Sequence, residues 1–227
     1  MELTQITLGG FLIQEPVTLL TDLLLGGECL YLATRLYPVS KPASASRMIM
    51  IFLIIMGIGT IEGGIVNHGW YYLFGPGWKT PMVLLVGSSL PFLMLGNVLS
   101  LKGRDVLSPK WFNWLYGFIA VEYLGWLISL CSWSLDEIDF KAMIPHLGIG
   151  LVAFVAALQG LARRRDPHPA RDQMLWAIAA ILPVAVVQVL KISPARWFNM
   201  FDLAHILLLL PMYLIYRAGK QFASMES

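Results

Sequence analysis

The chain has 227 residues, of which 57% are hydrophobic and only 13% are charged. Soluble domains carry about 25% charged residues, so this composition excludes an ordinary soluble domain and indicates a protein of the lipid bilayer. The formal net charge is only +2, and we therefore expect no nucleic-acid partner.

Seven apolar segments follow one another along the chain, each with the roughly 20 residues that a membrane-spanning helix needs. We predict spans over residues 16–37, 46–68, 80–101, 111–133, 142–163, 173–191 and 200–218. The connections combine charges with proline or other turn-forming residues, and none is long enough for a second domain. The sequence thus predicts an all-α integral membrane protein, in which residues 1–227 form a single domain, a seven-transmembrane helix bundle.

Lysine and arginine gather in alternate connections of this predicted bundle. Of the 16 basic residues, 12 flank the first, third and fifth connections or follow the last span. They are Arg35, Lys41, Arg47, Lys102, Arg104, Lys110, Arg163, Arg164, Arg165, Arg171, Arg217 and Lys220. Short cytoplasmic loops carry such an excess of positive charge. We therefore expect the N-terminus outside and the C-terminus in the cytoplasm, in a plasma or inner membrane.

The first predicted helix carries a polar stripe that no interfacial anchoring explains. Glu15, Thr18 and Asp22 are spaced i, i+3 and i+7 and so share one helix face. A charged side chain at mid-helix costs about 2.5–3.5 kcal/mol on insertion scales, so Asp22 should face the bundle interior or a wet cavity. Glu122 in the fourth predicted helix lies at a similar depth. It is either a proton relay or a packing residue whose carboxyl group is hydrogen-bonded. Glu15 and Asp22 are the candidate catalytic acids.

Three of the four histidines are predicted to lie in the outer leaflet, on three different helices. His68 ends the second span, His146 lies near the outer start of the fifth, and His205 lies about one and a half turns into the seventh. Asp202 precedes His205 by three residues and shares its face. Each also has a structural explanation: His68 as an interfacial anchor, His146 as a helix-start residue, and Asp202 with His205 as a capping pair.

Imidazole nitrogens and carboxylate oxygens are ligands of Zn²⁺, and a catalytic zinc site has three protein ligands and a water. His68, His146 and His205 could supply these ligands. Asp202 could replace one of them or orient a ligand histidine. Glu15 or Asp22 would then act as general base on the water. The chain has no HExxH, GxSxG or glycine-rich phosphate motif, so this hypothesis depends on the predicted clustering.

The histidines within "GIVNH" and "FDLAH", together with the helix count, carry a family resemblance. The chain resembles the seven-helix hydrolase superfamily of alkaline ceramidases and progestin/adiponectin receptors. That family carries Ser-x-x-x-His in its second helix, an Asp in its third and His-x-x-x-His in its seventh, binds zinc through three histidines and cleaves amide bonds in lipids. Only His68 and His205 match position by position. Gly64 replaces the serine, Phe201 replaces a histidine, the third span has no Asp, and His146 would be a ligand outside the family pattern.

The resemblance and the predicted cluster together lead us to expect a metal-dependent membrane hydrolase. Its substrate would be a lipid-like amide or ester that reaches an outward-facing site from the membrane lipid. The alternative is a non-enzymatic seven-helix protein: a sensor, a small-solute or proton-coupled transporter, or a subunit of a membrane complex. Asp22 and Glu122 would suit a proton-coupled carrier, whereas the chain shows no inverted halves or paired broken helices. The sequence is also compatible with an oligomer or with a larger membrane complex.

Overall fold

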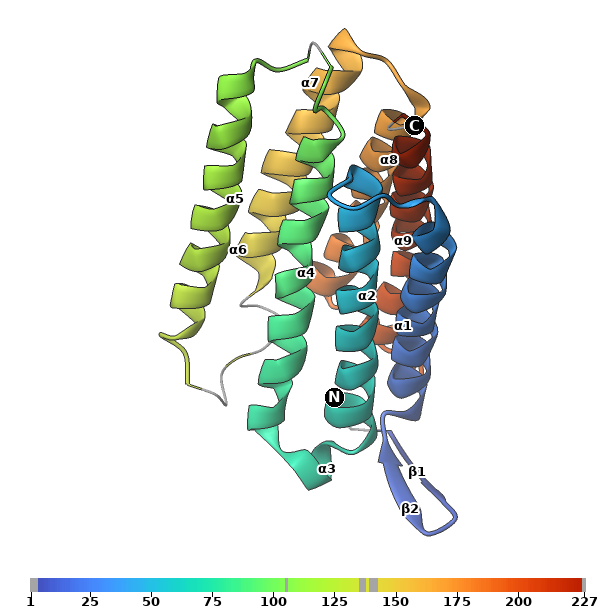
Figure 1. Ribbon diagram of the computed structural model, residues 1–227. Helices are drawn as coiled ribbons and strands as arrows, with labels where there is room; N and C mark the ends of the chain where they lie inside the picture. Colours follow the sequence, from blue (N-terminus) through green and yellow to red (C-terminus); the bar gives the residue numbers. More distant parts are fainter. Residues whose placement is uncertain (1–3, 105, 135–137, 139–142, 226–227) are drawn as a thin grey trace.

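Long helices that run side by side make up most of the protein (Figure 1). The computed structural model describes residues 4–104, 106–134, 138 and 143–225. The helices are α1 (Pro16–Leu36), α2 (Ala45–Gly63), α3 (Tyr71–Phe74), α4 (Lys79–Leu99), α5 (Pro109–Leu130), α6 (Ile144–Leu147), α7 (Ala157–Arg165), α8 (Pro169–Leu190) and α9 (Met200–Met225). The π-helical segment η2 (Gly64–Gly69) extends α2, and a second π-helical segment, η5 (Gly148–Ala156), joins α6 to α7.

Within the described residues, six helical stretches are long and apolar enough to cross a membrane. They are Pro16–Val39, Ala45–Gly69, Pro76–Leu99, Ile144–Arg165, Pro169–Leu190 and Met200–Met225. Large apolar side chains such as Leu20 and Val189 are exposed on these helices, which lipid tolerates and water does not. The prediction of an all-α, multi-pass membrane protein is therefore confirmed. α5 is not among the six, because its tryptophan and tyrosine residues, Asn113 and Glu122 lower its mean hydropathy.

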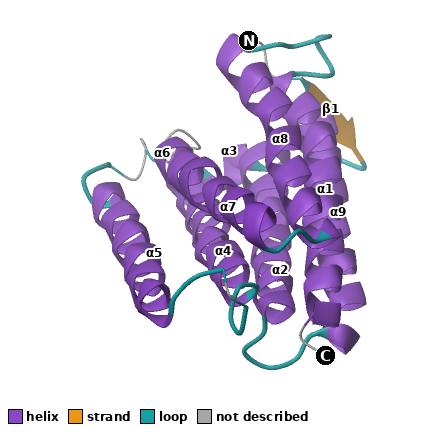
Figure 2. Ribbon diagram, turned by 90° about the horizontal axis from the view of Figure 1, so that it is seen from above, coloured by secondary structure: helices purple, strands orange, loops and turns teal. Residues whose placement is uncertain are grey.

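The helices pack unevenly. α1 lies against α2 and α9, α2 also against α4, and α8 against α9, whereas α5 packs mainly on α4 and stands at the edge of the bundle (Figures 1 and 2). At the α1–α2 crossing, a Cβ atom on Gly26 would lie 2.8 Å from the Gly57 carbonyl oxygen, and one on Gly57 would lie 2.9 Å from that of Gly26. Small residues allow such backbone contact between membrane helices.

A β-hairpin that was not expected from the sequence precedes α1. β1 (Gln5–Leu8) and β2 (Phe11–Gln14) pair antiparallel through Gly9 and Gly10, whose φ angles of 57° and 86° suit glycine in a two-residue hairpin turn. The Gln14 side-chain oxygen accepts a hydrogen bond from the Tyr72 backbone N–H at 3.0 Å. The hairpin is thereby attached beside η2, and it holds the residue that precedes α1.

A buried arginine ties together the opposite end of the bundle. Arg171, at the start of α8, is fully buried. Its guanidinium donates to the Asp166 carbonyl (2.8 Å), the Asp166 carboxylate (2.6 Å) and the Gln159 side chain (3.2 Å). Arg104 also donates to the Asp166 carboxylate, at 2.8 Å. The hydrogen bond from Arg171 lowers the pKa of Asp166, so this network stabilises the fold above pH about 4 and loses its effect as the pH falls through that lowered pKa.

Candidate functional site

Glu15 lies at the strained junction between the hairpin and α1. Its backbone is left-handed, with φ 43° and ψ 56°, a conformation that costs a non-glycine residue about 1–3 kcal/mol and recurs at functional sites. Pro16 starts the helix, and the Glu15 N–H donates to the Thr4 carbonyl at 2.8 Å. These constraints direct the Glu15 carboxylate at His68, whose Nδ1 lies 2.8 Å from Oε2.

His68 lies in the π-helical segment η2, where the Trp70 N–H donates to the carbonyl of Ile65, five residues back, at 3.0 Å. Such wide turns occur frequently at functional sites and shift the faces of a helix relative to the ideal 3.6-residue period. A Cβ atom on Gly64 would lie 2.6 Å from the Cβ atom of Asp22. Glycine at this position therefore lets α1 and η2 approach closely enough for Asp22 to face His68.

Asp22 lies between two histidines. Its side chain is buried, and the residue is 4% exposed. The His205 Nε2 atom lies 3.3 Å from Asp22 Oδ1, and the His68 Nε2 atom lies 4.0 Å from Asp22 Oδ2. The Thr21 hydroxyl lies 3.2 Å from the His205 Nδ1 atom. We call these five residues, Glu15, Thr21, Asp22, His68 and His205, the Asp22 cluster.

The hydrogen bonds of the Asp22 cluster determine which histidine nitrogen carries a proton. The Thr21 hydroxyl donates its only proton to the Thr18 carbonyl at 3.0 Å, so it accepts from Nδ1–H of His205. The Glu15 carboxylate likewise accepts from Nδ1–H of His68. In their neutral forms both histidines then present an Nε2 lone pair to Asp22, whose Oδ2 has no hydrogen-bond partner among the described residues. Such an arrangement requires positive charge between the three groups, as protons or as a cation.

A small cavity of about 120 Å³ adjoins the Asp22 cluster. Asp22, His68 and His205 line it, together with Thr60, Gln188 and mostly apolar side chains from α2, α4, α8 and α9. Phe201 contributes to this wall and packs against His68, with ring centroids 5.7 Å apart. The cluster therefore opens onto a small space whose walls are mostly apolar.

Asp202, a predicted ligand, takes part in the start of α9. Its Oδ2 atom accepts a hydrogen bond from the Asn199 backbone N–H at 2.6 Å, while the Asn199 side-chain oxygen accepts from the Phe201 N–H at 2.7 Å. This reciprocal arrangement is a capping box, which satisfies backbone donors at the beginning of a helix. The backbone thus uses Oδ2 of Asp202, whereas its Oδ1 atom is buried and has no hydrogen-bond partner among the described residues.

His146 belongs to a separate buried pair, so the structure does not assemble the predicted set of three histidines. Its Nδ1 lies 2.6 Å from Glu122 Oε1, and its Nε2 lies 3.0 Å from the Gly87 carbonyl oxygen. The Trp126 ring stacks on it at a centroid distance of 4.6 Å. A carbonyl accepts only from N–H, so Nε2 is protonated and Nδ1 shares a proton with Glu122. Neither nitrogen has a free lone pair for a metal ion.

The described part of the chain contains no group of three or more His, Cys, Asp or Glu side chains that is already placed as a metal site. In the Asp22 cluster, the 4.0 Å distance from His68 Nε2 to Asp22 Oδ2 is longer than the distance from His205 Nε2 to Asp22 Oδ1. Ligands of a tetrahedral zinc ion lie roughly 3.3 Å apart, given bond lengths of about 2.0–2.1 Å. The His205–Asp22 distance of 3.3 Å already fits this spacing, whereas His68 would have to move toward Asp22.

Residues 17–224 match the model of a family of unknown function (DUF6962). The chain belongs to this family. Asp22, His68 and His205 lie inside the matched segment, whereas Glu15 lies just before it. No curated protein and no solved structure matches the chain. Membership in DUF6962 names no activity, so the function has to be argued from the geometry of the site.

Three residues that shape the site were missed by the sequence analysis. Thr21 holds the His205 ring, Gln14 attaches the hairpin beside η2, and Asn199 caps α9. The Gly9-Gly10 pair between two apolar runs is a hairpin signal, and Asn199 with Asp202 three residues later is a capping signal. No sequence pattern distinguishes Thr21 from the other threonines, because its role depends on the neighbouring helix.

Proposed function

We propose that this protein is a metal-dependent membrane hydrolase that cleaves a lipid-like amide or ester at the Asp22 cluster. Asp22, His68 and His205 would hold a zinc ion. One observation carries the proposal: two Nε2 lone pairs, on η2 and α9, face the same buried carboxylate on α1. Two histidines and one carboxylate are a known ligand set of catalytic zinc.

The other members of the Asp22 cluster would position these ligands. Glu15 and Thr21 bind the Nδ1 atoms of His68 and His205, as carboxylates and other acceptors do for metal-binding histidines. A bound zinc ion would supply Lewis acidity toward a carbonyl oxygen and toward water. The apolar wall of the adjoining cavity would hold the hydrocarbon part of the substrate and exclude bulk water.

The membrane topology of the proposed enzyme includes α5 as a seventh span. With 22 residues, α5 is about 33 Å long, which is sufficient to cross a bilayer. It packs on α4, which is itself a candidate span. The distribution of basic residues supports an external N-terminus and a cytoplasmic C-terminus, in a plasma or inner membrane. The Asp22 cluster would then lie in the outer half of the bundle.

The proposal also draws on the resemblance to the alkaline ceramidase and progestin/adiponectin receptor superfamily. Phe201 occupies the position of that family's first helix-seven histidine, and its ring lies against His68. The position of the replaced histidine is thus close to the Asp22 cluster. Asp22 would serve as the third ligand in its place.

Chelation is the direct test of the proposed activity. Purified protein in detergent should release fatty acid from at least one member of a panel of N-acyl amides and acyl esters. Phenanthroline should abolish the release and added zinc should restore it, since the ligands in the Asp22 cluster would persist without the ion. A zinc-loaded, folded protein that cleaves no member of the panel, or a release that phenanthroline leaves unchanged, would contradict the proposal.

A second candidate function is proton-coupled transport, and the His146–Glu122 pair favours it. This pair shares a proton at a buried position, and the charge that the Asp22 cluster requires could also be protons. Metal-independent uptake of a solute into proteoliposomes, driven by a pH gradient and lost in Glu122→Gln, would support this function over hydrolysis.

A further inference from the structure

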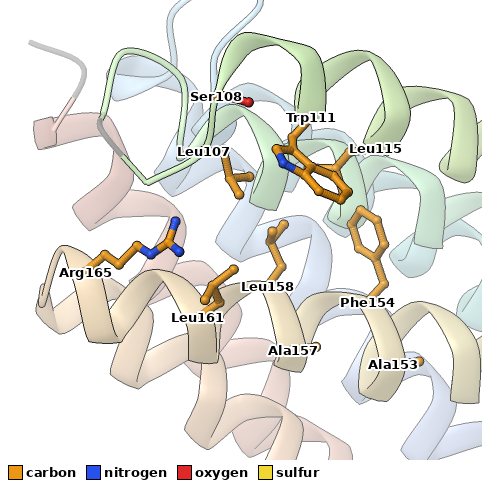
Figure 3. Close-up of a pocket in the computed structure, with 10 residues that line it drawn as sticks. All are labelled: Leu107, Ser108, Trp111, Leu115, Ala153, Phe154, Ala157, Leu158, Leu161 and Arg165. Atoms are coloured by element: carbon orange, nitrogen blue, oxygen red, sulfur yellow. The ribbon is translucent and has the colours of Figure 1, made fainter.

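An apolar groove separates α5 from η5 and α7 (Figure 3). Its volume is about 530 Å³, within the range of about 300–1,000 Å³ that is usual for small-molecule sites. Trp111 and Leu115 of α5 face Leu158 and Leu161 of α7 across it. The rings of Phe118 and Phe154 stack at 5.4 Å where α5 meets η5. The groove is therefore a hydrocarbon-lined channel along the edge helix of the bundle.

One end of the groove is polar and positively charged. Arg165 lines it and is exposed, and one guanidinium N–H donates to the Val106 carbonyl at 2.6 Å. This bond fixes the side chain at the groove and leaves four other N–H donors. Ser108 lines the same end at the start of α5, and its side chain caps no backbone N–H. The positive end of the helix dipole adds to the attraction for an anion.

The acidic residues near this end that the structure describes are bound to other arginines. Asp166 pairs with Arg104 and Arg171, and Asp172 pairs with Arg163. No described carboxylate forms an ion pair with Arg165. Among the residues that the structure describes, the charge of Arg165 is therefore left for a ligand in the groove.

We propose that this groove binds one anionic glycerophospholipid. The phosphate would contact Arg165 and Ser108, and an acyl chain would lie along Trp111, Leu115 and Leu158. A long apolar wall that ends at a cation matches an anionic amphiphile, and basic pockets between membrane helices bind such head groups. The site is independent of the proposed hydrolase, because it lies toward the end of α7, at the opposite end of the bundle from the hairpin and η2 (Figure 1).

Native mass spectrometry of the delipidated full chain in detergent tests this proposal. We expect one phosphatidylglycerol per chain to bind at least about fivefold more tightly than phosphatidylcholine with the same acyl chains, the factor expected from one basic residue. Arg165→Gln should remove this preference. Arg164→Gln makes the same charge change on an exposed neighbour outside the groove and should retain it.

A second pair of variants tests the apolar wall. Ala157→Phe adds a ring inside the groove and should lower phosphatidylglycerol occupancy, whereas Val152→Phe adds the same ring on an exposed face of η5 outside the groove and should not. Equal binding of the two lipids would overturn the proposal. So would binding without saturation at one lipid, an equal loss in Arg164→Gln, or full occupancy in folded Ala157→Phe.

Discussion

Asp22→Asn is expected to abolish hydrolysis and to weaken zinc binding by at least about 100-fold. The loss of even an indirect partner of a metal ligand typically costs about 10–100-fold, and Asp22 would be the only carboxylate ligand, facing both Nε2 atoms. The neutral asparagine amide also removes the charge that draws a cation into this buried position. Isothermal titration with zinc and fatty-acid release from the best substrate measure the two effects.

Glu28→Gln is the matched control for this experiment. Glu28 is a second acid of α1, half-buried, and it does not line the cavity beside the Asp22 cluster. Its substitution makes the same change of charge on the same helix and should leave zinc binding and hydrolysis within about twofold of wild type. A folded Asp22→Asn protein that binds zinc as Glu28→Gln does would remove Asp22 from the ligand set.

Arg171→Met is expected to lower the free energy of unfolding by about 2–3 kcal/mol, because it removes several hydrogen bonds from a buried charged group. Asp166 is partly exposed and keeps its hydrogen bond to Arg104, which places the loss toward the lower end of the range for a broken buried pair. The melting temperature in detergent should fall by roughly 4–12 °C.

Arg163→Met serves as the control for Arg171→Met. Arg163 pairs with Asp172 at the surface, where the two side chains are 58% and 42% exposed. An exposed pair contributes between about 0 and 1 kcal/mol, so this variant should melt close to wild type. Equal melting temperatures for the two variants would contradict the structural role of the buried Arg171 network.

The membrane class could be predicted from the sequence because hydropathy over about 20 residues reports burial in lipid directly. Six of the predicted spans correspond to helices that are long and apolar enough to cross a bilayer. Hydropathy over membrane-length segments does not detect the hairpin, because the four-residue strands Gln5–Leu8 and Phe11–Gln14 fall below that length.

Four of the five residues of the Asp22 cluster, all except Thr21, were predictable from the sequence, whereas their grouping was not. The i, i+7 spacing grouped Glu15 with Asp22, and the structure directs both at η2, although Glu15 precedes α1 with a left-handed backbone. Spacing cannot tell which helix that face meets, so His146 was grouped by depth with His68 and His205 although its partner is Glu122. The π-helical turn at Gly64–Gly69 adds a second difficulty, because it shifts the face of His68 from the ideal helix.

The metal content of the purified wild-type protein is the most direct test of the proposed zinc site in the Asp22 cluster. After the protein is offered zinc and passed through a desalting column, elemental analysis should find about one zinc per chain. His68→Ala and His205→Ala, measured beside it, should each lose most of that metal. Folded, monodisperse wild-type protein without zinc or another transition metal would contradict the claim, and the charge in the Asp22 cluster would then be protons.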